Sequence, residues 1–147
     1  MKKRLSGSWL IDSNIIVYAL DTQSSFYQDA CGVFQRIKDK EFTPVVAVQN
    51  ITEVIHVLHR SYKVNLQEAA ETIEGVITGF DIHVITPQIS TAQTFFGLLD
   101  KHSDAKSVYD TFLVATMVDN GYTSILTVNI KDFSFFSQIT SVNPFIT

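Results

Sequence analysis

The sequence has few of the residues on which several specialised protein classes depend. Among 147 residues there are one cysteine, three prolines and six glycines. The single cysteine, Cys31, excludes an internal disulfide and predicts a reducing, cytoplasmic compartment. The scattered glycines form neither a Gly-x-Gly-x-x-Gly turn nor a Walker phosphate loop. These absences exclude a disulfide-stabilised secreted domain and a glycine-loop nucleotide site.

Charge and long apolar runs are scarce as well. Charged residues make up 18% of the chain and the formal net charge is −4, which excludes nucleic-acid binding mainly through a basic surface. The apolar content of 46% excludes disorder. Apolar runs such as residues 45–48 are far shorter than the roughly 20 residues of a membrane span, so no membrane partner is expected. The low charge and the eleven phenylalanines leave more apolar surface than one small core should bury, which predicts an interface between copies of this chain.

The length predicts a single domain spanning residues 1–147, with its core at about residues 9–142. Short apolar runs predict strands near residues 8–11, 42–47, 82–85, 124–127 and 139–142. Helical spacing predicts helices that include residues 26–37, 51–58, 66–80, 92–99 and 112–117. Apolar strands that alternate with helices predict a three-layer α/β/α sandwich with a central, mostly parallel sheet of four to five strands.

Acidic and amide residues recur where the predicted strands end, which is where ligands bind in such sheets. Asp12 follows the first strand, and Glu53 opens the helix after the second. Asp110 opens the helix that leads to the fourth strand, and Asn129 and Asp132 follow that strand. Structural roles also fit each position: Asp12 fits an N-cap, and capping boxes fit Asn50 with Glu53, Ser107 with Asp110, and Asn129 with Asp132. Caps need not converge, however, whereas metal-binding acids must, so their shared sheet edge favours a cation site.

The surroundings of Asp110 support this interpretation. Leu113, Val114 and Met117 share its helix face and form an apolar stripe. A carboxylate above a buried face has a large desolvation cost, which a divalent cation removes. Carboxylates bind Mg²⁺ or Mn²⁺, and two such ions about 3.5–4 Å apart activate water and stabilise the leaving oxygen of a phosphodiester. These cations also offset the repulsion between an acidic pocket and a nucleic acid.

Four segments resemble the motifs of PIN-domain proteins. Residues 11–20, Ile-Asp-Ser-Asn followed by apolar residues, resemble the opening Asp-Thr-Asn motif. Residues 50–60, 109–127 and 127–133 resemble the second, third and fourth motifs. The resemblance implies a Mg²⁺- or Mn²⁺-dependent endoribonuclease of the VapC type. Such a protein is the toxin of a type II toxin–antitoxin pair, cleaves RNA, forms a homodimer and binds a cognate antitoxin.

The resemblance also implies a role for each matching residue. Asp12, Glu53 and Asp110 match the metal-binding, catalytic acids. Ser13 and Asn14 would support the site through hydrogen bonds, and Thr127 would line it.

The fourth motif departs from the family pattern, because Asn129 stands where many members have an acid. Two interpretations stay open: Asp132 supplies the missing charge as a catalytic acid, or Asn129 acts as a neutral metal ligand. Arg60, Lys106 and Lys131 are candidates for positioning RNA phosphates, although surface charge explains each of them equally well.

Two other functions remain as alternatives. Asn129 also fits a PIN-like module that binds nucleic acid or protein without catalysis. A phosphotransferase of the haloacid-dehalogenase type needs a second aspartate two residues after the nucleophile, and Asn14 occupies that position here.

Overall fold

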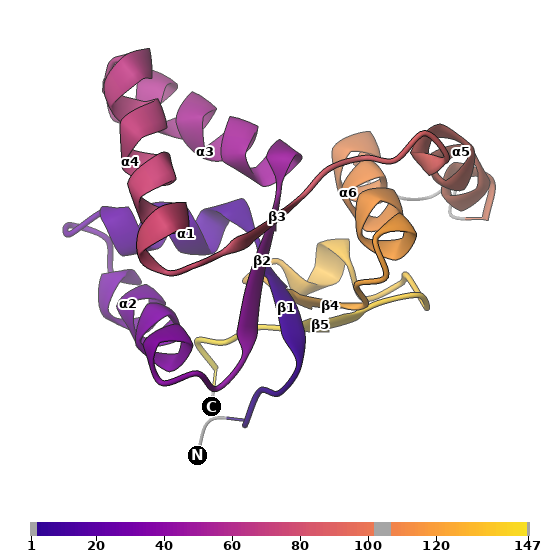
Figure 1. The fold of residues 1–147 in the computed structure, drawn as a ribbon, viewed down its shortest axis with the longest axis horizontal. Coiled ribbons are helices and arrows are strands. Elements are labelled where there is room, and N and C mark those ends of the chain that lie inside the picture. Colours follow the sequence, from indigo (N-terminus) through magenta and orange to yellow (C-terminus); the bar gives the residue numbers. More distant parts are fainter. Residues whose placement is uncertain (1–2, 102–106, 147) are drawn as a thin grey trace.

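The computed structural model describes residues 3–101 and 107–146. Within them, five strands form one sheet in the order β3-β2-β1-β4-β5, and every neighbouring pair is parallel (Figure 1). The strands are β1 (Ser8–Ile11), β2 (Thr43–Ala47), β3 (His83–Ile85), β4 (Ser124–Leu126) and β5 (Thr140–Val142). The predicted parallel sheet is therefore confirmed, with the fifth strand included.

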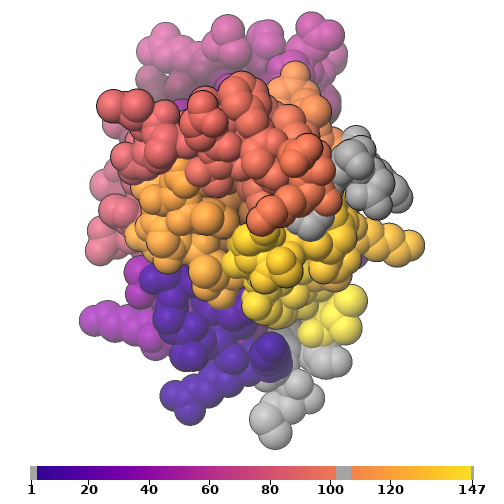
Figure 2. Space-filling view, turned by 90° about the vertical axis from the view of Figure 1, so that its right-hand side faces the viewer, coloured from indigo at the N-terminus to yellow at the C-terminus, as the bar shows by residue number. Residues whose placement is uncertain are grey.

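Helices cover both faces of this sheet. They are α1 (Ser13–Leu20), α2 (Tyr27–Lys38), α3 (Val48–Arg60), α4 (Leu66–Gly79), α5 (Thr91–Lys101), α6 (Val108–Asp119) and the short 3₁₀ helix η1 (Ile130–Asp132). Figure 1 shows α1 to α4 on one side of the sheet and α5 and α6 on the other. Figure 2 shows α5, in coral, at the outer surface of this second side, with the C-terminal segment, in yellow, below it. The predicted three-layer α/β/α sandwich is confirmed.

The strands alternate between two apolar cores, one on each face of the sheet. Ile11 and Leu126 are fully buried in the core formed with α1 to α4. Leu10 and Ile125 are fully buried in the other core, formed with α5 and α6. Because successive side chains of a strand point to opposite faces, strands that are apolar throughout need a helical layer on both sides. In the described segments, no helix has the combined length and apolar character that crossing a membrane requires.

Two helix starts differ from the sequence prediction. The apolar spacing marks no helix over residues 13–20, yet α1 occupies them, with Asp12 as the N-cap that the sequence allows. Helix α3 begins at Val48, earlier than predicted, because Asn50 Oδ1 reaches back to accept a hydrogen bond from the Ala47 N–H (3.0 Å). Glu53 consequently lies in the second turn of α3. The predicted capping box of Asn50 and Glu53 is therefore wrong.

Helix α5 also presents a different face from the one predicted. The apolar spacing predicts that Phe96 packs inward, but this side chain is 59% exposed. The buried positions of α5 are Thr91 and Leu98. The hydroxyls of Thr91 and Thr94 donate hydrogen bonds to the Asp119 carboxylate of α6 (2.9 and 2.7 Å). This polar contact between the two helices sets the rotation of α5, and apolar periodicity alone does not reveal it.

The parallel topology brings separate chain segments to one edge of the sheet. Asp12 directly follows β1, Thr127 directly follows β4, and α3 begins directly after β2. In a parallel sheet these carboxyl ends point the same way, and ligands bind beyond them. The side chains that follow the strands are therefore neighbours, although they lie far apart in the sequence.

The two-core packing makes a direct prediction for stability. Leu10→Ala removes a fully buried side chain from the central strand, and we expect the free energy of unfolding to fall by about 2–5 kcal/mol. The matched control is Leu66→Ala, which truncates a leucine that is 57% exposed and should change stability by no more than about 0.5 kcal/mol. Urea unfolding curves measure both values, and equal losses in the two variants would contradict the packing described.

Candidate functional site

Asp12 lies at the centre of the carboxyl edge and is only 7% exposed. Its Oδ1 accepts a hydrogen bond from the Ser13 N–H (2.9 Å), which caps α1. Its Oδ2 accepts a hydrogen bond from the Thr127 hydroxyl (2.7 Å). The carboxylate therefore serves as a helix cap, and Thr127 also connects it to the chain that follows β4. The capping and functional interpretations of Asp12 are compatible.

Ser13 connects Asp12 to the second acid of the site. Its hydroxyl donates a hydrogen bond to Glu53 Oε2 (2.7 Å), while its backbone N–H donates to Asp12 Oδ1, the N-cap of α1. The other oxygen of this carboxylate, Glu53 Oε1, accepts a hydrogen bond from Gln49 Nε2 (3.1 Å). Both oxygens of Glu53 are thus held by side chains, one on α1 and one on α3.

Asp110 enters the site from the other helical layer. It lies in the first turn of α6, where its N–H donates to the N-cap Ser107 Oγ (3.3 Å). Ser107 therefore acts as the predicted cap. As the sequence predicts, Leu113 and Met117 on the same helix are buried. The side chain of Asp110 itself is half-buried at the end of this apolar stripe.

Burial and like charge act together on these acids. Burial raises the pKa of Asp12 from 3.8 to about 6, against the lowering effect of its hydrogen bonds from Thr127 and Ser13, and the charge of Glu53 raises it further. Burial also raises the pKa of Asp110 to about 6, and the charges of Asp132, Asp12 and Glu53 add to this effect. Four acids therefore influence one another electrostatically at this edge.

The chain after β4 contributes one acid and one amide. The Asn129 N–H donates to Thr127 Oγ1 (3.0 Å), but the Asn129 side chain is exposed and makes no capping hydrogen bond to η1. Asp132 ends η1, and its charge is the first of those that raise the pKa of Asp110. The predicted capping box of Asn129 and Asp132 is thus not formed by the Asn129 side chain.

These acids match a hard divalent cation in chemical type. They offer only oxygen donors, which Mg²⁺ and Mn²⁺ prefer, and Mg²⁺ keeps several of its own waters. In their present positions, no three His, Cys, Asp or Glu side chains of the described residues form a group that could hold a metal ion. Their mutual repulsion and burial, however, are the costs that a shared cation removes.

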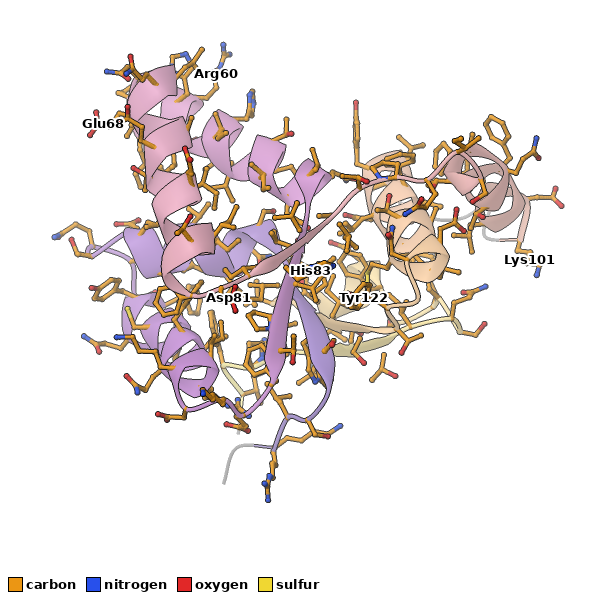
Figure 3. The ribbon with its side chains drawn as sticks, in the orientation of Figure 1. Arg60, Glu68, Asp81, His83, Lys101 and Tyr122 are labelled. Carbon is orange, nitrogen blue, oxygen red and sulfur yellow. The ribbon has the colours of Figure 1, made fainter. Side chains whose placement is uncertain are left out.

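The other residues that the sequence predicts for the site lie in different parts of the structure. Asn14 follows Ser13 in α1, and its Oδ1 is buried without a hydrogen-bond partner. Lys131 is exposed on η1, next to Asp132. Arg60 is exposed at the outer end of α3 (Figure 3), about 10 Å along the helix from Glu53. Lys106 lies outside the described residues.

Sequence reasoning missed Gln49. Besides Glu53, its Nε2 donates a hydrogen bond to the backbone oxygen of Tyr109 (2.8 Å), at the start of α6. The spacing of four residues between Gln49 and Glu53 is a signal for the first contact, because such pairs face each other on a helix. No sequence signal indicates the second contact, which joins residues 60 positions apart.

The arrangement of strands and helices is found in solved structures of known function. The first is VapBC2 from Rickettsia felis bound to a promoter DNA fragment (TM-score 0.69, 15% identity, 92% of this chain and 98% of that chain covered). The second is VapC20 from Mycobacterium tuberculosis, a toxin that cleaves the sarcin-ricin loop (0.65, 12%, 85% and 92%). The third is a toxin–antitoxin complex from Klebsiella pneumoniae (0.64, 18%, 92% and 97%).

This likeness establishes the fold. The chain has the PIN-like α/β/α fold of VapC-type toxin structures, as the sequence resemblance predicts. No protein-family model and no curated protein matches the sequence. With identities of 12–18% to the three structures, an activity for this chain has to be argued from its own side chains.

The raised pKa of Asp12 makes a prediction for stability in the absence of metal. The folded state holds the proton on the Asp12 carboxyl more tightly than the unfolded state does. The contribution of Asp12 to the free energy of unfolding is therefore greatest below pH 3.8 and is lost as the pH rises through about 6. Asp12→Asn removes the charge, so we expect the variant to be about 1–3 kcal/mol more stable than wild type at pH 7.5. The difference should shrink as the pH falls to 4. Urea unfolding in a chelator measures it.

Glu41→Gln is a matched control whose change in stability at pH 7.5 should have the opposite sign to that of Asp12→Asn. The hydrogen bond from Arg36 lowers the pKa of Glu41 from 4.5 to about 2, so its stabilising contribution is present above pH 4.5 and lost as the pH falls towards 2. Glu41→Gln should therefore be less stable than wild type at pH 7.5. An Asp12→Asn difference that is independent of pH, or that grows as the pH falls, would contradict the burial of this charge.

Proposed function

We propose that this protein is a Mg²⁺- or Mn²⁺-dependent endoribonuclease and the toxin of a toxin–antitoxin pair. The observation that carries the proposal is the gathering of Asp12, Glu53, Asp110 and Asp132 at one sheet edge, where burial and like charge raise the pKa of Asp12 and Asp110. Perturbed acids of this kind are typical of functional sites. The PIN-like fold supports the same interpretation, and the sarcin-ricin loop cleaved by the Mycobacterium tuberculosis toxin makes RNA the expected substrate class.

In this proposal, Asp12, Glu53 and Asp110 hold the cation. When bound, a divalent ion supplies activation of water for in-line attack on a phosphodiester and neutralises charge on the phosphate. Thr127 holds the Asp12 carboxylate, and Ser13 holds those of Asp12 and Glu53, through the hydrogen bonds described. Asp12 and Glu53 are therefore restrained before substrate arrives, which is part of what catalysis by positioning requires.

We assign the fourth acidic position to Asp132 rather than to Asn129. Asp132 acts electrostatically on Asp110, whereas the Asn129 side chain is exposed. The backbone of Asn129 instead helps to orient Thr127, through the hydrogen bond from its N–H. Lys131 is the better placed basic residue for contact with an RNA phosphate, because it is exposed beside Asp132, while Arg60 lies at the far end of α3.

Two protein partners are part of the proposal. A cognate antitoxin is expected, because the solved structures that share the fold include toxin–antitoxin complexes. A homodimer is expected from apolar side chains left in solvent on α5 and at the start of α6. Phe96, Val108 and Tyr109 are 59%, 55% and 72% exposed, and side chains of this kind are enriched at protein interfaces.

One alternative has a specific observation in its favour. A PIN-like module that binds without catalysis agrees with Asn129 and with the lack, in the described residues, of a ready-made group of three metal ligands. The same cleavage experiment decides between the two functions.

The proposal predicts metal-dependent cleavage of RNA. Wild-type protein should cleave a panel of single-stranded and stem-loop RNAs in Mg²⁺ or Mn²⁺ and should lose this activity in chelator. Asp12→Asn and Asp110→Asn should each reduce the rate by about 100-fold or more, because loss of a metal-binding acid costs at least as much as loss of a supporting residue. Gel electrophoresis of end-labelled RNA measures the rate.

Glu74→Gln is the matched control for these variants. Glu74 is an exposed acid on α4, so its neutral variant should cleave RNA at the wild-type rate. Undiminished cleavage by both aspartate variants would refute the proposed site. If the wild-type protein binds RNA but does not cleave it, the result would establish the binding module instead.

A further inference from the structure

The Gln49 side chain joins the two helical layers across the carboxyl edge of the sheet. Its Nε2 donates to Glu53 Oε1 on α3 (3.1 Å) and to the Tyr109 backbone oxygen on α6 (2.8 Å). These helices cover opposite faces of the sheet (Figure 1). The amide therefore connects the segment that carries Glu53 to the segment that carries Asp110, one residue after Tyr109.

The orientation of this amide is determined by its partners. A carboxylate oxygen and a backbone oxygen only accept hydrogen bonds, so the NH₂ group of Gln49 has to face both of them. Its Oε1 is then left buried without a hydrogen-bond partner. An unpaired buried acceptor costs free energy, and such exceptions require an explanation in a folded protein. A contribution to the neighbouring site gives one.

The consequence for the site is that the Glu53 carboxylate and the backbone next to Asp110 are restrained together. Ser13 holds Glu53 Oε2 from α1, and Gln49 holds Glu53 Oε1 from α3, so the carboxylate cannot rotate without losing a hydrogen bond. The bond to the Tyr109 oxygen fixes the backbone directly before Asp110. One side chain thus restrains Glu53 and the start of α6 together.

We propose that Gln49 is a positioning residue that sets the distance between Glu53 and Asp110, so that both carboxylates reach the same divalent ion. This inference rests on the proposed function, since it concerns the same metal site. Gln49 does not bind the ion or the RNA. It acts through the carboxylate and the backbone that it holds, as residues outside the ligand shell do in other metal proteins.

The experiment compares Gln49→Met with a matched control on another helix. Gln67 Nε2 donates to Glu71 Oε1 on α4 at the same distance (3.1 Å) and with the same spacing, but it is exposed and lies on a different helix from the acids. Gln67→Met therefore removes an equivalent Gln–Glu contact without touching the site. Met and Ala are good helix formers, so Gln49→Met and Gln49→Ala should keep α3 intact.

Calorimetric titration of metal-free protein with Mn²⁺ is the main measurement, with thermal unfolding and RNA cleavage kinetics beside it. We expect Gln49→Met and Gln49→Ala to weaken the Mn²⁺ Kd by about 10-fold or more and to lower kcat with little change in KM. Gln67→Met should leave the Mn²⁺ Kd, kcat and KM unchanged. A loss of stability without a change in Mn²⁺ Kd would show a merely structural role and overturn the proposal.

The outcomes separate this inference from the proposed function. Wild-type protein that binds Mn²⁺ but cleaves no RNA would refute the ribonuclease activity, while a weaker Kd in the Gln49 variants would still support positioning of a metal site. Wild-type protein that binds no Mn²⁺ would overturn both. If Gln49→Met fails to fold, the Kd of Gln49→Ala decides: a value equal to that of wild type overturns the inference, and a weaker value supports it.

Discussion

Negative charge buried at the carboxyl edge of the sheet is the constraint on which the rest of the site depends. The Asp12 carboxylate is buried, and hydrogen bonds from Thr127 and the Ser13 N–H only partly offset the cost of burial, since its pKa still rises to about 6. The pKa of Asp110 is also raised to about 6, by burial and by the charge of Asp132. A structure with no use for these charges would be more stable with neutral residues here. The proposed cation-dependent function would explain why these charges are present.

The scaffold meets this constraint through connections between distant segments. The parallel sheet brings the ends of β1 and β4 together, and the helices that follow or precede strands add further acids from both layers. Short hydrogen bonds then connect the segments in sequence: Thr127 to Asp12, Ser13 to Glu53, and Gln49 to the start of α6. Asp12 and Glu53 are thus held by side chains from several segments rather than by one flexible loop, which is the support that a precise site needs.

Features that depend on local pattern were predictable, and those that depend on contacts between layers were not. Apolar runs predict the strands, and the order of strands and helices places Asp12 and Asp110 at one edge. The capping-box spacing of Asn50 and Glu53 predicts the wrong start for α3. The Asn50 side chain instead accepts a hydrogen bond from the Ala47 N–H, and the helix begins earlier. Helix α5 turns a different face inward, since hydroxyl contacts to α6 outweigh the apolar pattern. The contact of Gln49 with α6 leaves no trace in the sequence, because its acceptor is a backbone oxygen.

The central claim is that Asp12, Glu53 and Asp110 share one divalent ion, and a crystal structure in Mn²⁺ tests it most directly. Data collected at the manganese absorption edge locate the ion by its anomalous scattering. We expect a peak beyond the carboxyl ends of β1 and β4, with oxygens of these carboxylates at metal-binding distances of about 2.0–2.3 Å. Crystals saturated with Mn²⁺ that show no peak at this edge, with Asp12 and Asp110 turned away from each other, would contradict the account.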